Sequence, residues 1–243
     1  MKKILVPSLI ALAVSSLASV AQAQTAPEST LSFNAGVVSD YRYRGISQSR
    51  LNPALQGGVD YADKSGFYVG AWGSTIKWIK DAGGDANVEL DLYGGYKGAV
   101  GDVAYDVGFL RYEYPSNKLA VSANTNEVYG AVTYGLFTAK YSHAVSNLFG
   151  FGDSKNSYYL DLSAALDLGD GYTLTPHVGR QSVKNNTAYS YNDYALTLGK
   201  DLGNGLSASA AVIGTNADKA LYITPEGKFT GKTGVVVGLK YAF

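Results

Sequence analysis

Apolar and polar residues alternate along much of this chain with a period of two, which predicts β-strands. The last segment shows the pattern most clearly, because one parity is wholly apolar: Val235, Val237, Leu239, Tyr241 and Phe243. The other parity carries mostly small residues and one lysine. Successive side chains of a strand point to opposite faces, so one face of this strand is apolar throughout. Such a face suits contact with lipid or burial in a soluble sandwich, and it would promote aggregation at an exposed sheet edge.

This last strand resembles the C-terminal strand of bacterial outer-membrane β-barrels, whose terminal phenylalanine the barrel assembly machinery recognises. The resemblance implies that Val237, Leu239, Tyr241 and Phe243 close the barrel and form the assembly signal. Outer-membrane lipid and the barrel assembly machinery are then the expected partners.

Twelve strands are predicted by the same alternation. Their expected ranges are 30–40, 53–61, 66–77, 87–97, 102–112, 125–134, 136–145, 156–167, 171–181, 191–200, 205–214 and 232–243. The third has apolar residues on both parities, so its faces stay unassigned. Pro176 lies inside the ninth and removes a ladder donor, which indicates a bulge, a local strand end or a later strand start.

The connections between these strands alternate strictly between long and short. The long ones are 41–52, 78–86, 113–124, 146–155, 182–190 and 215–231. Outer-membrane barrels have short periplasmic turns and longer external loops, whereas a soluble Greek-key sandwich has no reason to keep this alternation. The sequence therefore predicts an all-β fold, a transmembrane antiparallel up-and-down β-barrel of about 12 strands with both ends on the short-turn side.

The first 23 residues have the features of a secretory signal peptide. Lys2 and Lys3 precede an apolar run over residues 4–20, and Ala21-Gln22-Ala23 supplies a small-x-small cleavage site. The run is short for a stable anchor, although a first transmembrane helix is the alternative. We therefore expect a signal peptide at 1–23, a single barrel domain at 24–243, and export to the outer membrane of a Gram-negative bacterium.

Composition agrees with a chain that alternates between lipid-facing and lumen-facing residues. The chain has 20 Tyr against 8 Phe and 2 Trp, and its mean hydropathy of −0.04 is close to zero. No later apolar run reaches about 18 residues, which excludes helical spans. The formal net charge is zero, or −2 without Lys2 and Lys3, so nucleic acid is not an expected partner. The absence of Cys excludes disulfides and thiolate metal sites, and no cofactor is predicted.

Three segments carry a more specific resemblance. They are Ser39-Asp-Tyr-Arg-Tyr-Arg-Gly-Ile-Ser-Gln48, Pro53-Ala-Leu-Gln-Gly-Gly-Val-Asp-Tyr61 and Gly66-Phe-Tyr-Val-Gly-Ala-Trp-Gly-Ser74. The chain is similar to the Gcw_chp, or TorF-type, porin family over essentially all of its length after residue 23. The resemblance implies an outer-membrane β-barrel and supplies neither a substrate nor catalytic residues.

Charged residues on the strands should point into the lumen, because a lipid-facing Arg or Lys at the bilayer midplane costs about 2–4 kcal/mol. The pore-lining candidates chosen on this parity are Arg42, Arg44, Asp60, Glu89, Asp91, Asp106, Glu127, Lys140, Asp161 and His177, with Lys97 and Lys240 near the periplasmic ends. Acidic and basic candidates are too evenly balanced to predict an ion preference. Small residues on the same parity, such as Gly95, Gly108 and Gly179, favour open space and hence a narrow pore.

The sharpest local motif is Tyr41-Arg-Tyr-Arg44. If the first strand continues through it, Tyr41 and Tyr43 join the outer aromatic girdle while Arg42 and Arg44 point inward. The arginines would then line an external constriction that attracts anionic solutes. The alternative is a structural pair that holds the first loop against the lumen wall.

Catalysis and metal binding receive little support. The chain has two histidines, of which His143 falls on the lipid-facing parity and His177 on the lumen parity, and no serine can be assigned as a nucleophile beside His177. Asp81, Asp85 and Asp153 lie in long connections without the spacing of a calcium loop, so ordinary solvated loops are favoured.

The expected function is that of a porin-like channel for passive diffusion of small hydrophilic solutes, not an enzyme. The alternative is a closed structural or adhesive barrel that acts through its external loops, which carry Tyr112, Tyr114, Leu221, Tyr222 and Phe229. The pattern leaves the oligomeric state open.

Overall fold

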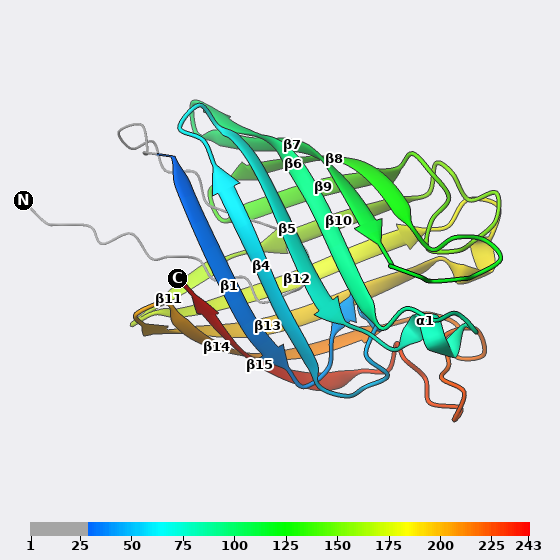
Figure 1. The fold of residues 1–243 in the computed structure, drawn as a ribbon. Coiled ribbons are helices and arrows are strands. Elements are labelled where there is room, and N and C mark those ends of the chain that lie inside the picture. Colours follow the sequence, from blue (N-terminus) through cyan, green and yellow to red (C-terminus); the bar gives the residue numbers. More distant parts are fainter. Residues whose placement is uncertain (1–28) are drawn as a thin grey trace, which may run out of the picture.

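The computed structural model describes residues 29–243, and the signal peptide expected at 1–23 lies outside the described residues. The strands form a closed antiparallel barrel with the long connections at one end (Figure 1). The barrel strands are β1 (Thr30–Val38), β4 (Ala54–Ala62), β5 (Phe67–Thr75), β6 (Val88–Val100), β7 (Val103–Glu113), β8 (Thr125–Tyr134), β9 (Phe137–Ala144), β10 (Tyr158–Ala164), β11 (Leu166–Gly169), β12 (Tyr172–Ser182), β13 (Tyr191–Gly203), β14 (Leu206–Thr215) and β15 (Gly234–Ala242). Since β10 and β11 continue one another, the barrel has twelve strands, as the alternation predicts.

The first and last strands close the barrel. β1 pairs with β15 from Asn34 opposite Ala242 to Val38 opposite Gly238. Past the ladder, Phe33 and Phe243 exchange backbone hydrogen bonds of 2.8 and 3.0 Å, and their rings stack with centroids 5.8 Å apart. The expected pairing of the last strand with the first is confirmed, and Phe243 lies at the short-turn end of the barrel (Figure 1).

Apolar side chains cover the outside of the barrel. Leu31, Val69 and Val235 expose 60%, 57% and 69% of their surface, as expected of residues whose solvent is lipid. Tyr68, in contrast, donates a hydrogen bond of 2.6 Å to Asp106 inside the barrel. The structure thus assigns the faces of β5 that the sequence left open, with Phe67 and Val69 outside and Tyr68 inside.

Pro176 lies in the middle of β12, which keeps a single register with β13 along its length. The strand on the other side of β12 is interrupted, because β10 ends at Ala164 and β11 begins at Leu166. Continuing the register of β10 with β12 places Pro176 opposite Ala164. Proline has no N–H to donate to the ladder, which predicts a strand end. Here the break occurs in the neighbouring strand, between β10 and β11, and not in β12 itself.

Tyrosines and glycines pair across neighbouring strands of the barrel wall. Tyr68 lies directly opposite Gly95 and Tyr129 directly opposite Gly108, and these two glycines are themselves opposite each other. A Cβ on Gly108 would stand 2.5 Å from the Tyr129 hydroxyl oxygen, so only glycine leaves room for the ring. Tyr93 opposite Gly70 repeats the arrangement inside the barrel, while Tyr105 opposite Gly98 and Tyr194 opposite Gly214 form the same kind of pair on the outer face. The lumen-facing glycines therefore hold tyrosine rings against the wall, which corrects the expectation that they mark empty space.

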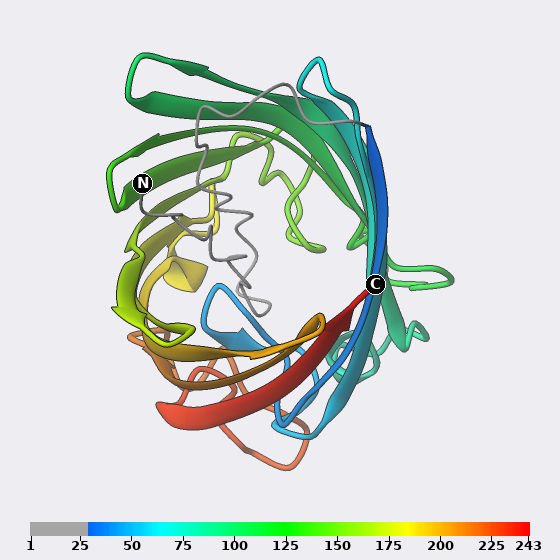
Figure 2. The same ribbon diagram turned by 90° about the vertical axis from the view of Figure 1, so that its left-hand side faces the viewer.

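The first long connection folds into the barrel. Residues 39–53, here called the inner loop, form a small hairpin of β2 (Arg42–Tyr43) and β3 (Ile46–Ser47), which is visible inside the ring of strands in Figure 2. Its two-residue turn is Arg44-Gly45, with φ of 47° and 79°, the positive values that a type I′ hairpin turn requires. A Cβ on Gly45 would stand 2.5 Å from Thr215 and 2.7 Å from Asp193, so the turn touches the wall at β13 and β14.

The remaining long connections pack together at the same end, which we call the long-loop end. In the described part of the chain, no helix is long and apolar enough to cross a membrane. The helical segments there are α1 (Trp78–Asp81) and the 3-10 helix η1 (Thr187–Tyr189). Buried apolar clusters join the loops to the inner loop, for example Tyr43 with Ile79 and Ile46 with Tyr191.

Candidate functional site

Arg44 links the tip of the inner loop to the barrel wall. Its Nη2 donates to both carboxylate oxygens of Glu127 on β8, at 2.7 and 3.0 Å, and its Nη1 donates to Gln181 Oε1 on β12 at 2.7 Å. The guanidinium also lies 4.4 Å from the ring centroid of Tyr159 on β10. Arg44 exposes 3% of its surface and Glu127 1%, so this is a buried ion pair that fixes the loop within the lumen.

Arg42 makes different contacts. It pairs with Asp40 and donates from Nη1 to the carbonyl oxygens of Gly45, Thr230 and Lys232, at 2.9, 3.0 and 3.1 Å. These partners belong to the inner loop itself and to the last long connection. Arg42 thus holds the loop in shape, whereas Arg44 crosses to the wall, and the two arginines do not form one functional pair.

Tyr41 and Tyr43 lie inside the barrel, so their expected place in an outer aromatic girdle was wrong. β1 ends at Val38, and the chain turns inward at Asp40, whose carboxylate accepts hydrogen bonds from Ser47, at 2.5 Å, and from Ser49, at 3.1 Å. Tyr41 donates to Glu89 at 2.5 Å. The alternation in Tyr41-Arg-Tyr-Arg44 is real, but it belongs to a hairpin with one face toward the lumen wall and not to a continued outer strand.

Acidic residues outnumber basic ones around this hairpin. Glu89 and Asp91 lie two residues apart on the inner face of β6, and both are buried. Asp91 Oδ1 has no hydrogen-bond partner within residues 29–243. Among those residues no group of three or more His, Asp or Glu side chains is arranged to hold a metal ion. Carboxylates therefore outnumber the guanidinium groups of Arg42 and Arg44 in the long-loop half of the lumen.

His177 stands in the wall between two carboxylates. Its Nδ1 lies 3.2 Å from Asp161 Oδ2, and its Nε2 lies 2.8 Å from Asp193 Oδ1. Tyr159 adds a hydroxyl 3.2 Å from Nε2. An imidazole that donates from both nitrogens is the protonated form, which gives the acidic wall a compensating charge. Asp193 was not among the sequence candidates, although it shares the lumen parity of Ala195 and Thr197 on β13 and the parity argument could have found it.

The candidates in the short-turn half lie along the wall. Tyr93 donates to Asp60 at 2.5 Å, and Asp106 accepts from Tyr68 while Lys97 Nζ lies 4.0 Å away. Lys140 places its ammonium 4.2 Å from the centroid of the Tyr129 ring. Among the described residues, each of these charges is thus met by a neighbour one or two strands away along the wall. All ten candidates chosen by parity have a place inside the barrel or in the inner loop, but they form three separate groups instead of one ring.

Comparison with known proteins assigns this chain to a family. Residues 22–243 match the family described as "Bacterial protein of unknown function (Gcw_chp)". The chain belongs to the Gcw_chp family. No curated protein matches it.

Solved structures show what fold this Gcw_chp protein has. It is similar to the KdgM porin, with a TM-score of 0.55 at 9% identity over 88% of this chain and 99% of that one. The NanC porin gives a TM-score of 0.53 at 10% identity over the same shares. The KdgM porin has also been solved in complex with disordered oligogalacturonate, and that structure gives a TM-score of 0.54 at 9% identity over 88% of this chain and 99% of that one. At such low identity the likeness shows the porin barrel fold alone.

Proposed function

We propose that this Gcw_chp protein is an outer-membrane channel for passive diffusion of small hydrophilic solutes, with the inner loop as its constriction. The observation that carries the proposal is the contrast between an apolar outer surface and a charged interior in a closed twelve-stranded barrel. A lumen lined by Asp60, Asp106, Lys97 and Lys140 holds water, since these groups would be costly to bury dry.

The proposed orientation follows the connections. Short turns of outer-membrane barrels face the periplasm and long loops face outside, so the inner loop would narrow the external mouth. Export by residues 1–23 and assembly by the barrel machinery remain part of the proposal. Twelve strands lie between the filled eight-stranded barrels and the open sixteen-stranded porins, and here the loop decides how much of the lumen remains open.

Ion preference should be weak. Arg44 offers a positive charge at the constriction, but Glu127 pairs with it at 2.7 Å and further carboxylates lie close by. The KdgM porin was solved with oligogalacturonate, whereas the guanidinium groups of Arg42 and Arg44 in the hairpin are both already engaged within the protein. We therefore propose small neutral or weakly charged solutes in preference to polyanions.

Single-channel recording of the refolded protein in planar bilayers tests the proposal. We expect small, reproducible conductance steps, and larger steps from Arg44→Ala, because the hairpin loses its attachment to Glu127 and Gln181. The surface variant Arg180→Ala is the matched control, since its side chain contacts only Asn192 on the exposed face. A correctly folded barrel that stays silent with and without Arg44 would favour the alternative, a closed barrel that acts through its loops. The loop packing and the buried Tyr112 and Tyr114 are compatible with that alternative.

A further inference from the structure

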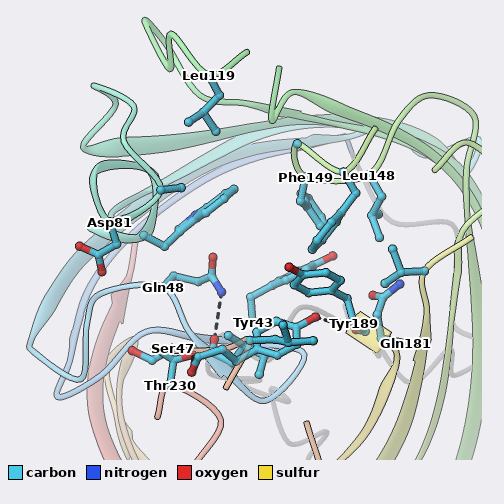
Figure 3. Close-up of a pocket in the computed structure, with 18 of the residues that line it drawn as sticks. Tyr43, Ser47, Gln48, Asp81, Leu119, Leu148, Phe149, Gln181, Tyr189 and Thr230 are labelled. Atoms are coloured by element: carbon cyan, nitrogen blue, oxygen red, sulfur yellow. Dashed lines mark hydrogen bonds between the residues drawn. The ribbon is translucent and has the colours of Figure 1, made fainter. Parts of the chain in front are cut away.

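A cavity of about 580 Å³ lies at the long-loop end, on the outer side of the hairpin (Figure 3). All six long connections contribute to its lining. Aromatic side chains dominate, with Tyr43 from the inner loop, Trp78 from α1, Tyr114, Phe149, Tyr189 and Tyr222. Its volume falls in the range of small-molecule sites, roughly 300–1,000 Å³. We call this cavity the vestibule.

Several polar side chains that line the vestibule are already hydrogen-bonded within the protein. Gln181 accepts from Arg44 and donates to the carbonyl oxygens of Tyr158 and Ser182, at 3.0 and 3.2 Å. Gln48 donates to Ile46 O at 3.0 Å, and the Tyr222 hydroxyl donates to Tyr189 O at 2.6 Å. A solute rich in hydroxyl groups would therefore lose its bonds to water without replacing them, which disfavours its binding.

One polar atom beside the cavity has no partner. Trp78 Nε1 is buried and has no hydrogen-bond partner among the described residues, while the indole ring packs edge-on against Tyr114 at 5.2 Å between centroids. Because this N–H is buried, it is not open to an acceptor inside the cavity. The vestibule thus offers several aromatic faces without an accessible indole donor.

Charge is balanced at the vestibule. Asp81, the acidic residue of its lining, forms an ion pair with Arg50. Burial raises the pKa of the Tyr222 phenol, which keeps it neutral at physiological pH. Arg44 and Glu127 are paired with each other beneath the hairpin. A charged ligand would lose hydration without gaining a free counter-charge.

We propose that the vestibule binds an uncharged aromatic solute. Its ring would pack between Phe149, Tyr189 and Tyr222, which line the cavity. Binding at this place does not require that the barrel conduct, so this proposal and the proposed channel function can fail separately.

Intrinsic fluorescence gives a direct test, because the chain has only two tryptophans. In Trp72→Phe protein refolded in detergent, Trp78 is the single reporter, and acetophenone is the probe. We expect saturable quenching by acetophenone, and at least tenfold weaker binding in a variant that also carries Phe149→Ala. Benzoate and maltose should not compete with the bound probe. Quenching that never saturates and is unchanged by Phe149→Ala would mean partition into detergent and would overturn the proposal.

Calorimetry compares the aromatic probe with a carbohydrate. We expect acetophenone to bind and maltose not to bind. Saturable binding of maltose without binding of acetophenone would identify a carbohydrate platform and overturn the proposed ligand class. Heat-modifiable mobility in gels shows that each variant is folded.

Discussion

The two halves of the lumen are built from the same strands but are filled differently. In the long-loop half, Glu127, Arg44 and Asp161 expose 3% or less of their surface, and the inner loop ties opposite walls together. In the short-turn half, Tyr68 and Tyr129 lie against the wall over Gly95 and Gly108, and the charges described there are met by neighbours along the wall. Strand alternation determines which residues face the lumen, but a segment outside the strands determines whether that lumen is closed.

Removing the ion pair at the hairpin should have the largest effect on this contrast. Arg44→Ala leaves Glu127 buried without its partner, which costs about 3–5 kcal/mol of unfolding free energy. Guanidinium unfolding in lipid vesicles measures the loss. The double variant Arg44→Met, Glu127→Gln should recover much of it, because no charge is left unpaired. A single variant as stable as the native protein would show that the hairpin is not held by this pair.

Loss of one hydrogen bond in the same half of the lumen should lower the unfolding free energy by less than loss of the ion pair. Tyr41→Phe removes the donor to Glu89, and a hydrogen bond to a charged group contributes about 1.5–3 kcal/mol. Tyr141→Phe on the outer surface is the matched control, since its hydroxyl contacts only His143 at 3.1 Å on the exposed face. Equal midpoints of unfolding for the two variants would contradict the importance of the buried contact.

The short-turn half can be disturbed through its glycines. A side chain at Gly108 would meet the Tyr129 hydroxyl at 2.5 Å and Gly94 O at 2.8 Å, so Gly108→Val should cost about 1–3 kcal/mol through overpacking. At Gly130 the nearest atom to a new Cβ is Val107 Cγ1 at 4.0 Å, so Gly130→Ala should be close to neutral. Tyr129→Ala combined with Gly108→Val should relieve the part of the clash that involves the tyrosine ring and leave the contact with Gly94 O. The same loss in both glycine variants would argue against tyrosine rings as the cause.

The smallest effect is expected at a short turn. Asp63 accepts hydrogen bonds from the hydroxyl and backbone N–H of Ser65, which lowers its pKa from 3.8 to about 2. A carboxyl whose pKa is lower in the folded state stabilises the protein above its unfolded value, and that contribution disappears as pH falls from 3.8 toward 2. Asp63→Asn should therefore lower the unfolding midpoint slightly at pH 7 and match the native protein near pH 2. A difference in unfolding midpoint that stays the same across this pH range would show that the Asp63 carboxylate is not its cause.

Much of the barrel followed from the sequence, because period-two alternation and strand length are local signals. They gave twelve strands, the alternation of connections, and the pairing of Phe243 with the first strand. The break expected from Pro176 did not occur in its own strand, which keeps one register with β13, and the interruption lies in the neighbouring strand instead. These features depend on residues that are close in the chain or on the closure of the whole sheet.

The interior was less predictable, since it depends on contacts between residues far apart in the chain. The alternation at Tyr41-Arg-Tyr-Arg44 does not distinguish an inward hairpin from a continued strand, and the inward position depends on Glu127 and Gln181. The Arg44-Gly45 turn was the one local signal, because Gly at the second position suits a type I′ hairpin. In the same way, Gly108 favours open space until its partner across the ladder is known to be Tyr129.

The contacts of Arg42 have a consequence for biogenesis. Its guanidinium is held by the carbonyl oxygens of Thr230 and Lys232, immediately before β15, the strand that seals the barrel against β1. These contacts of the inner loop can form only once the segment before β15 is in place. The positioning of the loop and the closure of the wall therefore depend, during folding, on the same stretch of chain.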